Sequence, residues 1–97
     1  MKQSKARESK AHSEMAQKLT DLSRKDCVSF KALVDQLSDK RLSMILFLRH
    51  GYGCSWDCVD AELKSQGMYY SLRHIFRLYA KALDQAEQIL KRSGAES

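Results

Sequence analysis

The feature that most constrains the fold is an apolar repeat in the last third of the chain. Apolar side chains recur at intervals of four and three residues, at Leu72, Phe76, Tyr79, Leu83, Ala86 and Leu90. This spacing is typical of a heptad seam along one side of a helix, and Ile75 and Ile89 widen it. Ser71 precedes the repeat as an N-cap and Gly94 follows it, so we predict one long helix between them.

The rest of the chain also favours helices. Its 97 residues include no proline and 4 glycines, and the alternation typical of strands is nearly absent. We predict an all-α protein of about five helices, with residues 13–93 as a single domain. Residues 1–12 are expected to form a flexible basic tail, through Lys2, Lys5, Arg7 and Lys10. Such a tail either follows phosphates or enters a minor groove as an arm, or simply remains solvated.

The apolar residues divide the first half of the chain into three helices. Met15, Leu19 and Leu22 mark a helix over residues 13–25 with a narrow seam. Ser29 is the expected cap of a short second helix, and Ser38 that of a third, which ends at Gly51. The expected core residues of these two helices are Phe30, Leu33, Val34, Leu37, Leu42, Ile45, Leu46, Phe47 and Leu48.

Three cysteines, Cys27, Cys54 and Cys58, suggest reduced thiols, because the number is odd and the charged N-terminus lacks an export signal. A cytoplasmic protein is therefore expected. Cys54, Cys58 and the nearby His50 raise the alternative of a metal site, but their spacing matches no common zinc arrangement. We therefore expect no metal and no other cofactor, with Cys58 as a small core residue and Cys54 in a loop.

Residues 55–81 form the expected functional unit, two helices joined by a polar turn. Ser55 caps the first helix, whose inward side holds Val59, Leu63 and the small Ala61, and Gly67 stops it. Trp56, beside the start of that helix, is expected to pack against neighbouring helices rather than to stack on bases. The second helix carries Arg73, Arg77 and Lys81 opposite its apolar side.

The charge pattern favours a polyanionic partner. The chain has a net charge of +5, from 17 basic and 12 acidic side chains. Lys40, Arg41 and Arg49 lie in a stretch without acids, as do Arg73, Arg77 and Lys81. The alternative is an ordinary solvated face that binds nothing.

The run from Ile45 to Ala82 resembles the helix-turn-helix units of small plasmid and phage regulators and of relaxosome accessory proteins. The matching positions are Ile45, Leu48, Gly51, Ser55, Val59, Leu63, Gly67, Ser71, Ile75 and Arg77. The resemblance covers less than half of the chain. Cys58 and Val59 stand where an Ile-Ala pair is common, and the turn between Leu63 and Ser71 is long. The resemblance implies a three-helix core whose Ser71 helix enters a groove of duplex DNA.

This resemblance also implies roles for individual residues. The start of a recognition helix reaches base edges, which makes Tyr69, Tyr70, Ser71, Arg73 and His74 candidate contacts. Arg73 or Arg77 would bind guanine, Tyr70 a phosphate or a thymine methyl, and Lys81 a phosphate. Lys40 and Arg41 complete the expected DNA-binding surface.

The carboxyl-terminal part of the repeat needs a covering partner. Either the helix at residues 13–25 covers it, or a second copy does, and we slightly favour a homodimer through Leu83, Ala86, Ile89 and Leu90. The predicted function is sequence-specific binding of double-stranded DNA, for repression or for organising a plasmid or phage complex. The alternative is a protein-interaction module, such as an antitoxin, an inhibitor or an adaptor, that uses the same repeat. No acid, base and nucleophile can be grouped from the spacing, so an enzyme is not expected.

Overall fold

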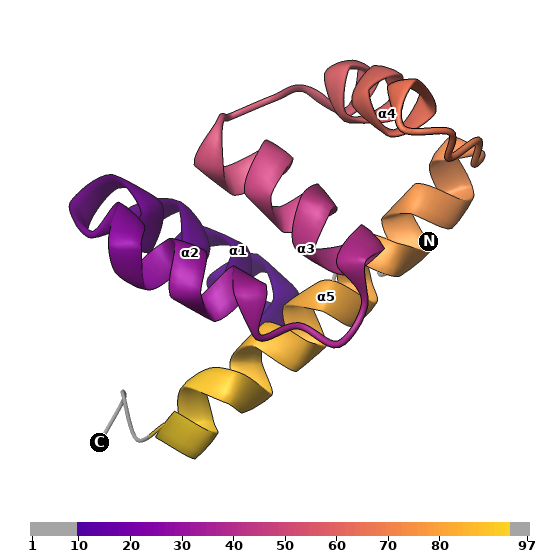
Figure 1. Ribbon diagram of the computed structural model, residues 1–97. Helices are drawn as coiled ribbons and strands as arrows, with labels where there is room; N and C mark the ends of the chain where they lie inside the picture. Colours follow the sequence, from indigo (N-terminus) through magenta and orange to yellow (C-terminus); the bar gives the residue numbers. More distant parts are fainter. Residues whose placement is uncertain (1–9, 94–97) are drawn as a thin grey trace.

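The computed structural model describes residues 10–93, which form five α-helices and one π-helical segment (Figure 1). In chain order these are α1 (Lys10–Lys25), α2 (Cys27–Asp35), α3 (Lys40–Leu46), η2 (Phe47–Gly51), α4 (Trp56–Ser65) and α5 (Leu72–Ser93). Residues 10–93 contain no strand. The predicted all-α fold with a long carboxyl-terminal helix is confirmed. Within the same range, no helix is both long enough and apolar enough to cross a membrane.

The long helix α5 is the element on which the others assemble. Its most extensive contacts are with α3, and it also packs against α1, α2 and α4. Figure 1 shows α4 beside the amino-terminal end of α5, whereas α1 and α2 lie toward its carboxyl-terminal half. The amino-terminal half of α5 is therefore covered less completely than the rest.

The buried side of α5 is rotated from the one that the repeat predicts. Its most buried side chains are Ile75, Leu78, Ala82, Leu83, Ala86 and Ile89. By contrast, Leu72 and Phe76, which begin the predicted seam, remain 42% and 45% exposed. The predicted seam and the buried side are two overlapping apolar stripes that share Leu83 and Ala86, and Leu72 and Phe76 are the seam residues that the core leaves exposed.

The residues of the expected dimer surface are mostly buried within the chain. Leu83, Ala86 and Ile89 are at most 9% exposed because they pack in the core of their own chain, which α1 and α2 complete. Leu90 is half-buried and packs against the same core. The intramolecular alternative, in which the Met15 to Leu22 helix covers the repeat, therefore accounts for these side chains.

The ends of α4 and α5 follow the sequence. Ser55 caps α4, since its side chain accepts a hydrogen bond from the Cys58 amide at 3.2 Å. Gly67 has a φ of 83°, and the amides of Gly67 and Met68 donate to the carbonyls of Lys64 and Leu63 at 2.9 Å each. These two bonds form a Schellman motif, which satisfies carbonyls that the helix end leaves free. The Ser71 hydroxyl accepts a hydrogen bond from the His74 amide at 3.1 Å, as an N-cap does.

Two other predicted caps are wrong. Asp26, not Ser29, caps α2, and its carboxylate accepts hydrogen bonds from both the amide and the hydroxyl of Ser29. Asp39, not Ser38, caps α3 by accepting from the Arg41 amide at 2.9 Å. Each carboxylate lies at the positive end of a helix dipole, where its negative charge is stabilising.

The first helix begins earlier than expected. α1 starts at Lys10, so Lys10 to His12 belong to a helix rather than to a tail. Lys2, Lys5 and Arg7, which were expected to form a basic arm, lie outside the described residues.

The third helix ends in a wider turn. After Leu46 the chain continues as η2, and the Tyr52 amide donates to the carbonyl of Phe47, five residues earlier, at 3.1 Å. Gly51 closes this segment as predicted. A Cβ atom at Gly51 would lie 3.2 Å from the Phe30 ring, so the glycine permits close packing of η2 on α2.

Helix α4 buries two of its side chains in the core. Val59 and Leu63 are fully buried as predicted, but Ala61 and Cys58 are exposed. The prediction that Cys58 is a core residue is therefore wrong. Its neighbour Cys54 is half-buried against the core in the loop before α4.

Two leucines of α5 provide a matched test of its orientation. Leu83→Ala is expected to lower the free energy of unfolding by about 2 to 4 kcal/mol, because it opens a cavity in a closed core. Leu72→Ala should cost less than about 1 kcal/mol, because Leu72 is already partly hydrated. Urea denaturation of both variants measures the difference. Equal losses, or a Leu83→Ala protein of unchanged stability but altered oligomeric state, would contradict the packing described above.

Candidate functional site

A cationic surface, here called the basic face, consists of Arg73, Arg77, Lys81 and Lys40. The first three are spaced by four residues on one side of α5, and all four side chains are exposed. Lys81 lies near the start of α3, where its charge helps to lower the pKa of Asp39. Among residues 10–93, none of the four forms an ion pair. Asp84 is the first acidic residue of α5, so the first three turns of α5 carry no acid, and Asp39 at the start of α3 is an acidic neighbour of Lys81.

Arg41 and Tyr70, both candidate DNA contacts, bind each other at the edge of this face. The Arg41 guanidinium donates to the carboxylate of Asp39 at 2.6 Å and to the hydroxyl of Tyr70 at 3.4 Å. Hydrogen bonding to Arg41 lowers the pKa of Asp39 to about 2. The Tyr70 ring stacks on His74, with 4.8 Å between ring centroids. These contacts join the start of α3 to the turn before α5.

The remaining two candidate DNA contacts, Tyr69 and Ser71, differ in whether their side chains are available to a ligand. Tyr69 is 73% exposed in the turn between α4 and α5, close to the start of the basic face. The hydroxyl of Ser71 caps α5 and is therefore engaged. The structure thus brings all nine predicted DNA-contact residues to the region where α3, α5 and the preceding turn meet.

A second surface, here called the aromatic groove, was not expected from the sequence. It is a hollow of about 630 Å³ beside the basic face, lined by His12, Trp56, Arg73, Phe76, Arg77, Tyr79, Ala80 and Leu83. The Trp56 ring meets the rings of Phe76 and Tyr79 edge to face, at 5.0 Å and 4.9 Å between centroids. Trp56 is therefore packed against neighbouring side chains, as predicted. The exposed Phe76 is the part of the cluster that reaches solvent.

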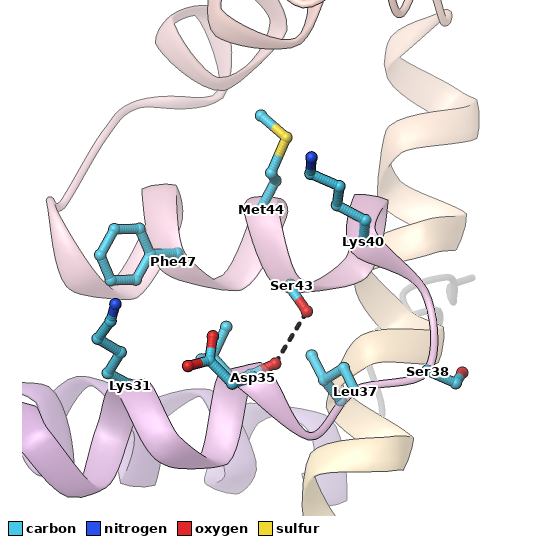
Figure 2. Close-up of a pocket in the computed structure, with 9 residues that line it drawn as sticks. Lys31, Asp35, Leu37, Ser38, Lys40, Ser43, Met44 and Phe47 are labelled. Carbon is cyan, nitrogen blue, oxygen red and sulfur yellow. Dashed lines mark hydrogen bonds between the residues drawn. The ribbon is translucent and has the colours of Figure 1, made fainter.

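Another hollow of about 510 Å³ lies between α2 and α3, and it mixes both charges (Figure 2). Lys31 and Asp35 of α2 face it from one side, and Lys40 and Met44 of α3 project on the other, away from α2. The hydroxyl of Ser43 already donates to the carbonyl of Val34 at 2.8 Å. This hollow offers no group of polar atoms that converge on one point, so it is a weaker candidate for a binding site.

A half-buried histidine joins α1, η2 and α5. The two ring nitrogens of His50 lie 2.9 Å from the hydroxyl of Thr20 and 2.9 Å from that of Tyr79. The hydroxyl of Ser23 donates to the His50 carbonyl at 2.8 Å. Burial, with a smaller contribution from the charge of Arg49, lowers the pKa of His50 to about 4. The neutral ring therefore donates to one hydroxyl and accepts from the other, which suits a structural role.

The cysteines do not build a metal centre with His50. Among the residues described, no three His, Cys, Asp or Glu side chains lie close enough to hold a metal ion. The adjacent thiol of Cys58, with some burial, raises the pKa of Cys54 and favours its neutral form. His50 is engaged by hydroxyl groups instead.

Comparisons of the chain with models of protein families, with curated proteins and with solved structures give no match. Its function must therefore be inferred from its own side chains. The basic face and the aromatic groove, which share Arg73 and Arg77, are the two strongest candidates for a binding surface.

His50 makes stability depend on pH in a defined window. The folded protein keeps His50 neutral down to about pH 4, whereas the unfolded chain binds a proton below about pH 6.5. The stabilising contribution is thus complete above pH 6.5 and is lost as the pH falls toward 4. Between about pH 7 and about pH 5 we expect a loss of about 1 kcal/mol, allowing for the partly exposed ring.

Chemical denaturation at the two pH values tests this loss. His50→Gln should be less stable near pH 7 and should show a weaker pH dependence. His74→Gln, which changes an imidazole outside this hydroxyl network, should keep the pH dependence of the wild type. An unchanged pH dependence in His50→Gln would exclude His50 as its source.

Proposed function

We propose that this protein binds double-stranded DNA in a sequence-specific manner, with α5 as the helix that enters the groove. The observation that carries the proposal is the exposed basic face on the first three turns of α5. Arg73, Arg77 and Lys81 point away from the core there, while Ile75 and Leu78 anchor the opposite side of the same turns. A helix that is fixed on one side and cationic on the other suits the major groove of DNA.

The electrostatics of the face support a polyanionic partner. None of its cations forms an ion pair among residues 10–93, so binding a phosphate breaks no described ion pair. Lys40 and Lys81 lie where α3 meets α5, and they suit phosphates that flank a groove. Release of counterions from DNA would supply most of the affinity and would make binding sensitive to salt.

Sequence discrimination would come from the amino-terminal part of the face. Arg73 and Arg77 have long, exposed side chains that can each donate two hydrogen bonds to guanine. Tyr69 stands exposed just before them, whereas Tyr70 and His74 stack on each other. In this proposal Tyr70, His74 and Arg41 hold the turn in place, and Arg73 and Arg77 contact bases. Repression and the organisation of a nucleoprotein complex are both uses of such binding.

The alternative of a protein-interaction module that uses the repeat from Leu83 to Leu90 has less support, because Leu83, Ala86 and Ile89 are buried and Leu90 is half-buried. A protein-interaction module has a different basis in the exposed Phe76 and the hollow around it. That surface is treated separately below.

Two single substitutions separate base contacts from phosphate contacts. Sites are first selected from random duplex DNA and then titrated at several salt concentrations. Arg73→Ala should reduce the preference for the selected site over a single-base variant by about tenfold, through loss of a contact worth about 1 to 3 kcal/mol. Lys81→Ala should weaken all duplexes similarly and reduce the slope of log affinity against log salt by about 1.

Arg24→Ala and Lys25→Ala are the matched controls. Both residues are exposed at the carboxyl-terminal end of α1, about 20 Å along that helix from His12, which contacts α5. They remove the same charges without touching the basic face. If the controls weaken binding as much as the α5 variants do, attraction depends on net charge alone. Absence of duplex binding at low salt would reject the proposed function.

A further inference from the structure

Two apolar side chains of α5 are exposed although the proposed DNA binding does not involve them. Leu72 and Phe76 are 42% and 45% exposed, and they share one side of the helix. Phe76 continues into the aromatic groove, where the partly buried Trp56 and Tyr79 extend the apolar surface. Contiguous exposed apolar surface on a small domain indicates a binding site for another molecule.

The shape of the groove suits a helix. Its lining on α5 runs from Arg73 to Leu83, a length of about 15 Å along the helix axis. Ala80 lies between Phe76 and Leu83, and its small side chain leaves the hollow open between them. Apolar residues at positions i, i+4 and i+7 of an α-helix span about 10 Å, which fits within this length.

The charge of the rim specifies the chemistry of the partner. Arg73 and Arg77 line the groove, and no acidic side chain does so among the residues described. The guanidinium of Arg49, which does not line the groove, lies 4.6 Å from the centre of the Trp56 ring. Arginine and aromatic side chains together are typical of the residues that dominate protein interfaces. Acidic residues flanking an apolar stripe would complement this rim.

A second copy does not supply such a stripe from its described residues. Besides Tyr69, Leu72 and Phe76, the large exposed apolar side chains are Val28 on α2 and Tyr52 in a loop, which do not form a stripe along one helix. A dimer in which the two aromatic grooves face each other would also place the arginines of both copies close together, where their charges repel. A different protein is therefore the better source of a complementary helix.

We propose that the aromatic groove binds an acidic amphipathic helix of a partner protein, which inserts its apolar stripe between Trp56, Phe76 and Ala80. Its carboxylates pair with Arg73 and Arg77. Docking itself does not depend on the proposed DNA binding. Because these arginines belong to both surfaces, the helix and DNA are expected to exclude each other, and this last consequence does rest on the proposed function.

Fluorescence anisotropy with synthetic peptides tests the docking. The probe is a labelled helical peptide of about 15 residues with leucine or phenylalanine at i, i+4 and i+7 and glutamate on the remaining face. It should bind the full chain saturably at about 150 mM salt. A peptide with lysine in place of glutamate, and an acidic peptide with serine in place of the apolar residues, should each bind at least about tenfold more weakly.

Variants of the groove locate the site. Phe76→Ser removes the exposed anchor and Ala80→Trp fills the hollow, so each should weaken the acidic peptide by about tenfold or more. Val28→Ser, which removes an exposed apolar side chain from α2, should have no effect. Circular dichroism confirms that the variants fold. The proposal would be overturned if the three peptides bound equally well. It would also be overturned if the acidic peptide bound the wild type and both groove variants with equal affinity.

Sedimentation and DNA-affinity measurements distinguish a partner helix from the other possible ligands of the groove. If sedimentation shows a dimer that Phe76→Ser converts to a monomer, a second copy fills the groove and the proposal is wrong. Phe76→Ser and Ala80→Trp should leave DNA affinity within about twofold, whereas Arg73→Ala/Arg77→Ala should weaken both ligands. If the wild-type protein binds DNA but not the acidic peptide, the docking proposal fails; if it binds the peptide but not DNA, the proposed function fails.

Discussion

The burial of one stripe of α5 is the interaction on which the rest of the structure depends. Ile75, Leu78, Ala82, Ala86 and Ile89 place a continuous apolar surface under α3, α1 and α2. Because a helix has one orientation about its axis, this packing also decides which side chains face solvent. The position of the basic face follows from the core, since the same turns that anchor α5 present its arginines.

Local signals in the sequence were sufficient for much of the fold. Ser55, Gly67 and Ser71 act within a few residues of themselves, so their roles could be read directly. Ser29 and Ser38 misled because an aspartate close by was the better cap. The orientation of α5 could not be predicted, since both of its stripes are apolar and the choice depends on helices distant in sequence.

Of the two candidate surfaces, one could be predicted from the sequence and the other could not. The cations of the basic face lie together because their spacing along α5 is helical, and that spacing is visible in the sequence. The aromatic groove was missed because it unites Trp56 of α4, His12 of α1 and residues of α5. Its one available signal was Phe76, an aromatic residue flanked by arginine at positions 73 and 77. Sequence spacing within one helix cannot show that a ring from another helix stands beside it.

The unbroken course of α5 has a consequence for how this chain can vary. Each residue turns a helix by about 100°, so inserting or deleting one near Ala80 would rotate one half of α5 against the other. With the carboxyl-terminal half held under α1 and α2, Arg73 and Arg77 would swing around the axis and leave the face they now occupy. Changes in length between Leu72 and Ile89 should therefore not be tolerated.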